Sequence, residues 1–413
     1  MSKLAMLFGI TVALFIYGGA NLYVGHHLYV VITPLFPPFV SAKLPVFACL
    51  YGFLALLLLF PFFSLPRRIR MLATWIGSYW MGLFVYLLLG FLAADAVLLA
   101  GVVVQIVPWP VPADVSMWAW LLAVIAAVGL SAYGLLHARR LHIVRYEVQL
   151  GQSAGFGGSA VGAGSGENAQ NRQEGPFMKV VVISDLHLGA VHAEKRFEGV
   201  VARILEMKPD MVLIPGDLFN DDITRIRNPQ RVQRMFRLLA ERTPCGVFAS
   251  LGNHDGGRTF PQMAEFLREG GVTLLMEDCA VVDGPLGRLV LVGRLDPSPI
   301  GGYGSLRRKP TPEVLADARE RAPGAPLIVL DHTPIRLEQY DGEADVALIV
   351  SGHTHKGQIF PNNLITRRMY EVDYGHFRRN ENSPHVIVTS GAGTWGMPMR
   401  VGSDCEVVEI VLV

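Results

Sequence analysis

The segment Lys179-Val180-Val181-Val182-Ile183-Ser184-Asp185-Leu186-His187 passes from an apolar, β-branched run straight into a polar cluster. The same transition recurs four times further along the chain. The later clusters are Gly216-Asp217, Gly252-Asn253-His254-Asp255, Asp331-His332-Thr333-Pro334 and Gly352-His353-Thr354-His355. A single His-x-His or Asn-His-Asp occurs by chance, but five clusters that each close a Val/Ile/Leu-rich run form a strong pattern.

These clusters offer seven oxygen and nitrogen ligands and one additional histidine, which suits two divalent cations such as Mn, Fe or Zn. Asp185 and His187 are two residues apart, so in extended chain both side chains project to the same side. Taken alone, Asp217 or Asn253 is equally well a turn residue, and His332 a capping or core histidine. Together, such groups would be costly to bury without a ligand, so the sequence predicts a two-metal centre.

The apolar runs predict strands that are buried on both faces, and helical stretches fall between several of them. The expected strands are 179–184, 211–215, 246–251, 289–293, 327–330, 346–350, 386–389 and 407–413, and the expected helices are 193–207, 231–241, 262–269 and 312–321. This alternation indicates an α/β fold. In open α/β sheets the ligand site lies beyond the carboxyl ends of the strands, where every polar cluster of this chain is found.

The order of the clusters resembles that of the calcineurin-like metallophosphoesterase superfamily, whose pattern runs D-x-H, GD, GNH[DE], H and GHxH. The resemblance covers residues from about 178 to 413. Gly357-Gln358 and the segment from Ser390 to Glu406 are similar to a membrane-linked bacterial branch of that family. The resemblance implies a four-layer α/β/β/α sandwich, joined here to an N-terminal transmembrane helical domain.

The resemblance also implies a role for each cluster. The first metal would be bound by Asp185, His187 and His355, the second by Asn253, His332 and His353, and Asp217 would bridge the two. His254 is not a ligand and is the natural proton donor to the leaving group. Asp255 either orients that imidazole or is a simple turn residue. Lys356 stands where the family has glycine; Lys356 and Arg400 either contact substrate phosphate or are solvated surface charges.

The chain has a hydrophobic content of 51% and a charged content of only 17%, and its apolar excess is concentrated in the first third. Its apolar runs are 4–30, 44–64, 71–107 and 117–138, and a membrane span needs roughly 20 residues. We expect about four spans, with the long third run forming either one helix or two. The expected domains are a transmembrane domain at 1–145, a flexible Gly/Ser-rich linker at 146–177 and a metallophosphoesterase domain at 178–413.

Charge placement predicts the orientation of the chain. With four spans, Lys3 and both arginine clusters lie on the cytoplasmic side; the clusters are Arg67, Arg68 and Arg70, and Arg139, Arg140 and Arg145. We therefore expect an integral protein of the bacterial inner membrane with a cytoplasmic catalytic domain. The four scattered cysteines fit a reducing compartment. Asp95 is either a carboxylate on a substrate path or an interfacial, hydrogen-bonded helix contact.

These features predict a membrane-anchored phosphoesterase that cleaves a phosphodiester or pyrophosphate bond in a phosphorylated small molecule or lipid. A lipid-linked substrate such as UDP-diacylglucosamine, which some relatives cleave, suits a tethered enzyme. The alternatives are a nucleotide phosphodiesterase that is merely anchored, and a membrane sensor or transport protein whose soluble domain only binds ligand. The net charge of +1 argues against a nucleic-acid partner.

The charge pattern gives a topological prediction. A reporter that is active only outside the cytoplasm should be silent when fused after Tyr146 and active when fused after Pro110, because Val107–Asp114 would form an outer loop. Activity of the Tyr146 fusion would place the catalytic domain outside and contradict this topology.

Overall fold

The computed structural model describes residues 3–35, 44–57, 66–150, 176–220 and 222–413. It divides into two compact units, one formed by residues 1–136 with 396–399 and the other by 137–395 with 400–413. Most of the expected linker, from residue 151 to residue 175, lies outside the described residues.

The first unit is helical. Its elements are α1 (Lys3–Leu35), α3 (Leu44–Leu56), α4 (Arg67–Val103) and most of α5 (Ala113–His137). Among the described residues, three helices are long and apolar enough to cross a membrane: Phe8–Pro34, Arg67–Val103 and Ala113–His137. The last residues of the expected second span, 58–64, are not described, so the fourth span stays a prediction. The third run forms one helix of 37 residues, about 55 Å long.

Asp95 joins three of these helices by hydrogen bonds. Its carboxylate accepts from the Tyr23 hydroxyl at 2.5 Å and from the Trp120 Nε1 at 2.7 Å. The His27 Nε2 lies 3.1 Å from the same carboxylate. Tyr23 and His27 belong to α1, Asp95 to α4 and Trp120 to α5. Of the two interpretations of Asp95, the structure therefore supports the hydrogen-bonded helix contact.

The second unit contains two six-stranded sheets. In spatial order, the first consists of β1 (Leu141–Val148), β12 (Cys405–Leu412), β2 (Met178–Val182), β3 (Met211–Pro215), β4 (Val247–Ser250) and β5 (Val272–Leu274). The second consists of β10 (Gly375–Phe377), β11 (His385–Val388), β9 (Val346–Ser351), β8 (Leu327–Leu330), β7 (Gly287–Gly293) and β6 (Asp278–Gly284). Parallel pairs at the centre of each sheet bring several strand ends to one edge, as the sequence predicted.

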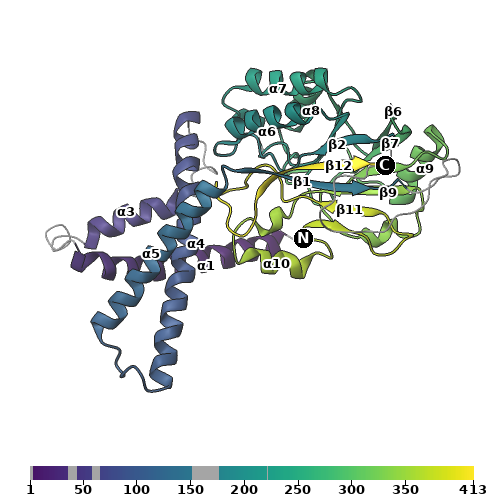
Figure 1. Cartoon of the computed structure of the whole chain (residues 1–413). Coiled ribbons are helices and arrows are strands. Elements are labelled where there is room, and N and C mark those ends of the chain that lie inside the picture. The colour runs from purple at the N-terminus through teal and green to yellow at the C-terminus, as the bar shows by residue number, and fades with distance from the viewer. Residues whose placement is uncertain (1–2, 36–43, 58–65, 151–175, 221) are drawn as a thin grey trace. The chain divides into compact units, whose positions relative to one another are not determined.

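Three apolar layers separate the sheets and helices of this unit. Helices α6 (Ala193–Met207), α7 (Pro229–Arg242) and α8 (Phe260–Glu269) gather on one face of the first sheet (Figure 1). Alternation along β2 sends Val181 toward these helices and Val180 and Val182 into the layer between the sheets. Helix α9 (Thr311–Arg321) covers the outer face of the second sheet. This confirms the expected four-layer α/β/β/α sandwich.

Strand β1 corrects the boundary expected from the sequence. Residues 141–145 were expected in the membrane domain and 146–148 in the linker, but all eight residues pair in parallel with β12. The charged residues in Leu141–Val148 concealed its alternation. In the sheet, Arg145 pairs with Glu409 at 3.1 Å while Val148 is fully buried. The second unit therefore begins before β1.

The position of β1 predicts how the second unit responds to truncation. A soluble variant that begins at residue 149 loses β1 and leaves the edge of β12 unpaired, so it should melt roughly 5–10 °C below a variant that begins at residue 137. Differential scanning fluorimetry on both variants measures the difference. Equal melting temperatures would show that β1 contributes nothing to the sheet.

Candidate metal centre

The five polar clusters lie in the loops that follow β2, β3, β4, β8 and β9. Backbone hydrogen bonds hold these loops together, including His187 N–H to the Asp217 carbonyl at 3.1 Å and Gly352 N–H to the His332 carbonyl at 2.9 Å. The sheets therefore bring clusters that are far apart in sequence to one edge.

Five of the seven expected ligands have left-handed backbone conformations. They are Asp185 (φ 54°), His187 (φ 46°), Asp217 (φ 52°), His353 (φ 71°) and His355 (φ 50°). Residues other than glycine rarely adopt positive φ, and such strain gathers at functional sites. Because left-handed residues cluster at these ligand positions, we infer that the loop conformation is maintained in order to direct the ligand side chains.

Two glycines allow the loops to approach each other. A Cβ atom at Gly252 would overlap the Asp217 carboxylate, and one at Gly352 would overlap the carboxylate of Asp185. Glycine is therefore required at both positions by the close approach of a neighbouring loop to an expected ligand.

Asp185, His187 and His355 form the first group of ligand atoms, all of them buried and within 4.8 Å of one another. The Nε2 atoms of His187 and His355 are 3.1 Å apart. The His355 Nε2 lies 3.4 Å from the Asp185 Oδ1. This is the set that the resemblance implied for the first metal.

The second group contains Asp217, His332 and His353, also within 4.8 Å of one another. The Asn253 Oδ1 lies 3.2 Å from the His332 Nε2 and 2.9 Å from the His353 Nδ1. The Asp217 Oδ2 is 3.3 Å from the His332 Nε2 and 3.7 Å from the His187 Nε2. Asp217 thus contacts both groups, as a bridging ligand must.

Burial controls the protonation of these side chains. It lowers the pKa of His353 to about 4, and burial together with the Arg400 charge holds the pKa of His355 well below its usual range. Both imidazoles are therefore neutral, as a metal ligand has to be. Burial and the nearby Asp217 charge raise the pKa of Asp185 to about 6.

Asp217 behaves differently from Asp185. Burial favours its neutral form, but the imidazoles of His332, His187 and His254 outweigh burial and hold its pKa below the usual range. The chain thus provides buried carboxylates, imidazole nitrogens and an amide oxygen at converging positions. This donor set fits two divalent cations with oxygen and nitrogen ligands.

Asp255 is bound by backbone amides. Its carboxylate accepts hydrogen bonds from Gly252 N–H at 2.8 Å, Phe219 N–H at 2.8 Å and Leu218 N–H at 3.3 Å. The fully buried carboxylate of Asp255 therefore links the Gly252–Asp255 loop to the loop after β3 through hydrogen bonds. This geometry favours a loop-positioning role over the orientation of an imidazole.

His254 lies beside the two groups without belonging to either. Its backbone N–H donates to the Asp217 Oδ1 at 2.9 Å. Its ring is 5.1 Å from the ring of His187 and 5.8 Å from that of Trp395, measured between centroids. The imidazole is therefore adjacent to the expected ligands, where a proton donor would act.

Neither interpretation of Arg400 is correct. Its side chain is fully buried and donates hydrogen bonds to the carbonyl oxygens of His355 (3.0 Å), Ser390 (2.7 Å) and Gly393 (2.6 Å). It therefore ties the C-terminal segment to the loop that carries His355. Lys356 places its ammonium 4.0 Å from the centre of the Tyr374 ring, a cation–π contact.

A third His/Asp group was not predicted from the sequence. The His137 Nε2 lies 2.7 Å, and the His142 Nε2 3.6 Å, from the same oxygen of Asp404. All three residues are partly exposed. This group depends on the pairing of β1 with β12, which brings His142 close to Asp404 and leaves no local pattern in the sequence.

Residues 178–357 match the family of calcineurin-like phosphoesterases. The chain is 27% identical to an uncharacterized metallophosphoesterase of Helicobacter pylori over 56% of this chain and 58% of the relative. It is 30% identical to a transmembrane protein with metallophosphoesterase domain of Danio rerio, over 57% and 53% of the two chains. It is 27% identical to the phosphodiesterase YaeI of Escherichia coli, over 57% and 83%.

The chain thus spans little more than half the length of the first two relatives. Among solved structures, a dimetal phosphatase from Danio rerio is similar over 53% of this chain and 90% of its own, with a TM-score of 0.35 and 12% identity.

The bridging position of Asp217 predicts the metal content of a variant. Asp217→Ala should hold far fewer than two divalent ions per chain after loading with Mn and desalting, because both groups lose a ligand. Asp345→Ala is the control, since that carboxylate pairs with Arg319 outside both groups. Full metal content in Asp217→Ala, measured by plasma mass spectrometry, would contradict the assignment.

Proposed function

We propose that this chain, which carries a calcineurin-like metallophosphoesterase domain, is a metal-dependent phosphohydrolase that cleaves a phosphodiester or pyrophosphate bond. One observation supports this above all: seven expected ligands from five loops gather in two groups that share Asp217. The E. coli relative is named a phosphodiesterase, which favours diesters among the substrates to test.

Divalent cations bound by the two groups would lower the pKa of a water molecule and neutralise charge on the phosphate oxygens. Asp217 contacts a histidine of each group and so fixes their separation. Asp255 and Arg400 hold the surrounding loops through backbone groups. The site is thereby organised before substrate binds, which lowers the reorganisation that the reaction requires.

His254 is the residue that we assign to proton transfer. The leaving oxygen becomes negatively charged as the P–O bond breaks, and a nearby protonated imidazole can neutralise it. His254 is adjacent to Asp217 through its backbone and to His187 through its ring. Because His254 is not one of the expected metal ligands, its imidazole would be available to donate a proton to the leaving group.

The apolar helices support membrane association, and the Danio rerio relative is named a transmembrane protein. We propose an inner-membrane protein with its catalytic unit on the cytoplasmic side, because one arginine cluster begins α4 and another follows α5, and such clusters normally lie in the cytoplasm. A lipid-linked substrate such as UDP-diacylglucosamine would suit an enzyme tethered in this way.

A substrate panel tests the proposed function. The purified full-length protein with Mn should hydrolyse an aryl phosphodiester, and the rates for UDP-diacylglucosamine and cyclic nucleotides then separate a lipid-linked substrate from a soluble nucleotide. No hydrolysis of any of the three by protein that holds both metals would contradict the proposal and favour a ligand-binding domain.

The role of His254 predicts a dependence on the leaving group. His254→Ala should retain its metals yet react about 10²–10⁴-fold more slowly with an alkyl diester. The loss should be much smaller with a nitrophenyl diester, whose leaving group needs no proton. His376→Ala is the control, because His376 stacks on His385 outside the two groups. Equal losses for both substrates would indicate that His254 positions substrate instead.

A further inference from the structure

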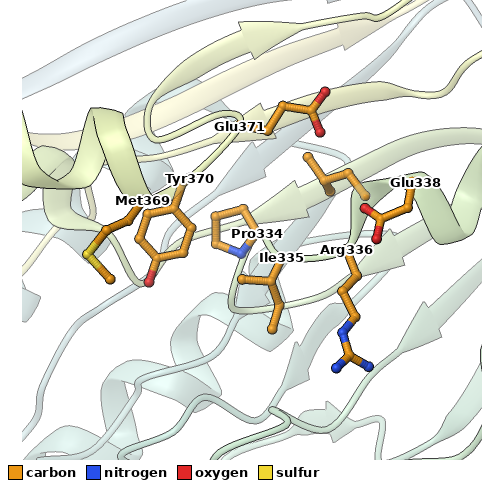
Figure 2. Close-up of a pocket in the computed structure, with 8 residues that line it drawn as sticks. Pro334, Ile335, Arg336, Glu338, Met369, Tyr370 and Glu371 are labelled. Atoms are coloured by element: carbon orange, nitrogen blue, oxygen red, sulfur yellow. The ribbon is translucent and has the colours of Figure 1, made fainter.

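Figure 2 shows residues that line a pocket of about 240 Å³. One of them, Tyr370, contacts His353 of the second ligand group. One wall is the segment from Pro334 to Glu338, which begins two residues after His332. The other wall is formed by Met369, Tyr370 and Glu371 at the end of α10 (Asn362–Met369). The Tyr370 ring stands edge-on to the His353 ring, with centroids 6.0 Å apart. One wall is therefore close in sequence to the expected ligand His332, and the other contacts the expected ligand His353.

The size of this pocket decides how much of a substrate it can hold. Sites that enclose a whole small molecule usually measure about 300–1,000 Å³. A volume of about 240 Å³ is below that range and suits one part of a larger molecule. Its place beside His353 makes it a subsite for whatever is attached to the phosphate that reacts.

The walls combine an apolar floor with a charged rim. Pro334 and Leu337 are buried and Ile335 is half-buried, whereas Arg336 and Glu338 are exposed. Figure 2 shows Tyr370 on one side of the pocket and Arg336 and Glu338 on the other. A ring or short chain could pack on the floor while polar groups of the same molecule reach the rim.

Arg336 is the cation at this rim, and the carboxylate of Glu338 beside it likewise has no side-chain partner among the described residues. Its guanidinium makes no hydrogen bond or ion pair within the part of the chain that the structure describes. By contrast, Arg308 pairs with Asp331 at 2.6 Å and Arg379 with Glu371 at 2.7 Å. The backbone of Arg336 is left-handed, with φ 54°. Such a conformation has a cost for a residue other than glycine, and functional sites tend to retain it.

We propose that Arg336 binds a second phosphate of the substrate, so that the preferred class is a diphosphate ester in which two phosphates share an anhydride oxygen. A planar guanidinium matches phosphate oxygens with two parallel hydrogen bonds. The inference rests on the proposed hydrolytic function and chooses between the two bond types that it left open.

The reaction balances without another reactant. Water gives its oxygen to the phosphorus at the metal centre, and the bridging P–O bond breaks. The electron pair goes to the oxygen of the departing phosphate, which Arg336 would stabilise. The products are two phosphate monoesters, and the protons of the water are released or transferred.

The test compares two substrates on the full-length protein loaded with Mn. For UDP-N-acetylglucosamine, Arg336→Met should raise KM about 10- to 100-fold, the usual effect of losing a charged hydrogen bond. For bis(p-nitrophenyl) phosphate, which has one phosphate, the kinetics should not change. Arg336→Lys should restore part of the affinity. Arg367→Met, which removes an exposed arginine of α10 that does not line the pocket, is the matched control.

A second variant tests the pocket without removing the charge. Ile335→Trp should fill the floor and raise KM for the diphosphate ester while the metal content remains unchanged. Hydrolysis of the aryl diester but not of the diphosphate ester by the unmodified protein would overturn the inference and leave the proposed function standing. An Arg336→Met variant that is unchanged, or equally impaired with both substrates, would also overturn it. Failure of the unmodified protein on both substrates would instead contradict the proposed function.

Discussion

The contacts of Asp217 with His332 and His187 connect the two ligand groups, and the surrounding architecture serves to keep them in place. A buried carboxylate is unfavourable unless cations or hydrogen-bond donors surround it. Here the imidazoles and the His254 amide supply those partners. The loop after β3 therefore meets the loops that follow β2, β4 and β8. Glycine at 252 follows from the close approach of Asp217, and glycine at 352 from that of Asp185.

The ligands could be predicted because their signal is local. Each follows a Val/Ile/Leu run, and strands ending at one edge bring such residues together without any knowledge of packing. Local patterns in the sequence also predicted most of the strands and helices. The expected ranges 211–215 and 193–207, for example, match β3 and α6. The roles of Asp255 and Arg400 could not be found in this way. An arginine in a sequence normally indicates a solvent-exposed side chain. Only the folded structure shows that three carbonyl oxygens accept hydrogen bonds from the buried guanidinium of Arg400.

Strand β1 was missed for a related reason. Its Arg145 follows the arginines after the last apolar run, so the segment was assigned to the end of the membrane domain. Its partner β12 is more than 250 residues away, and pairing at that distance leaves no trace in a local pattern. The pocket beside His353 is equally non-local, since its walls come from separate segments of the chain. The division of the chain into membrane domain, linker and enzyme otherwise stays a prediction from composition.

The central claim is that five strand-end loops assemble one two-metal centre. A crystal structure of the Mn-loaded protein, with ions located by anomalous scattering, tests it most directly. We expect two ions a few ångströms apart. One should be bound by Asp185, His187 and His355, the other by Asn253, His332 and His353, with Asp217 bridging them. A single ion, or ions bound elsewhere with these side chains unliganded, would contradict it.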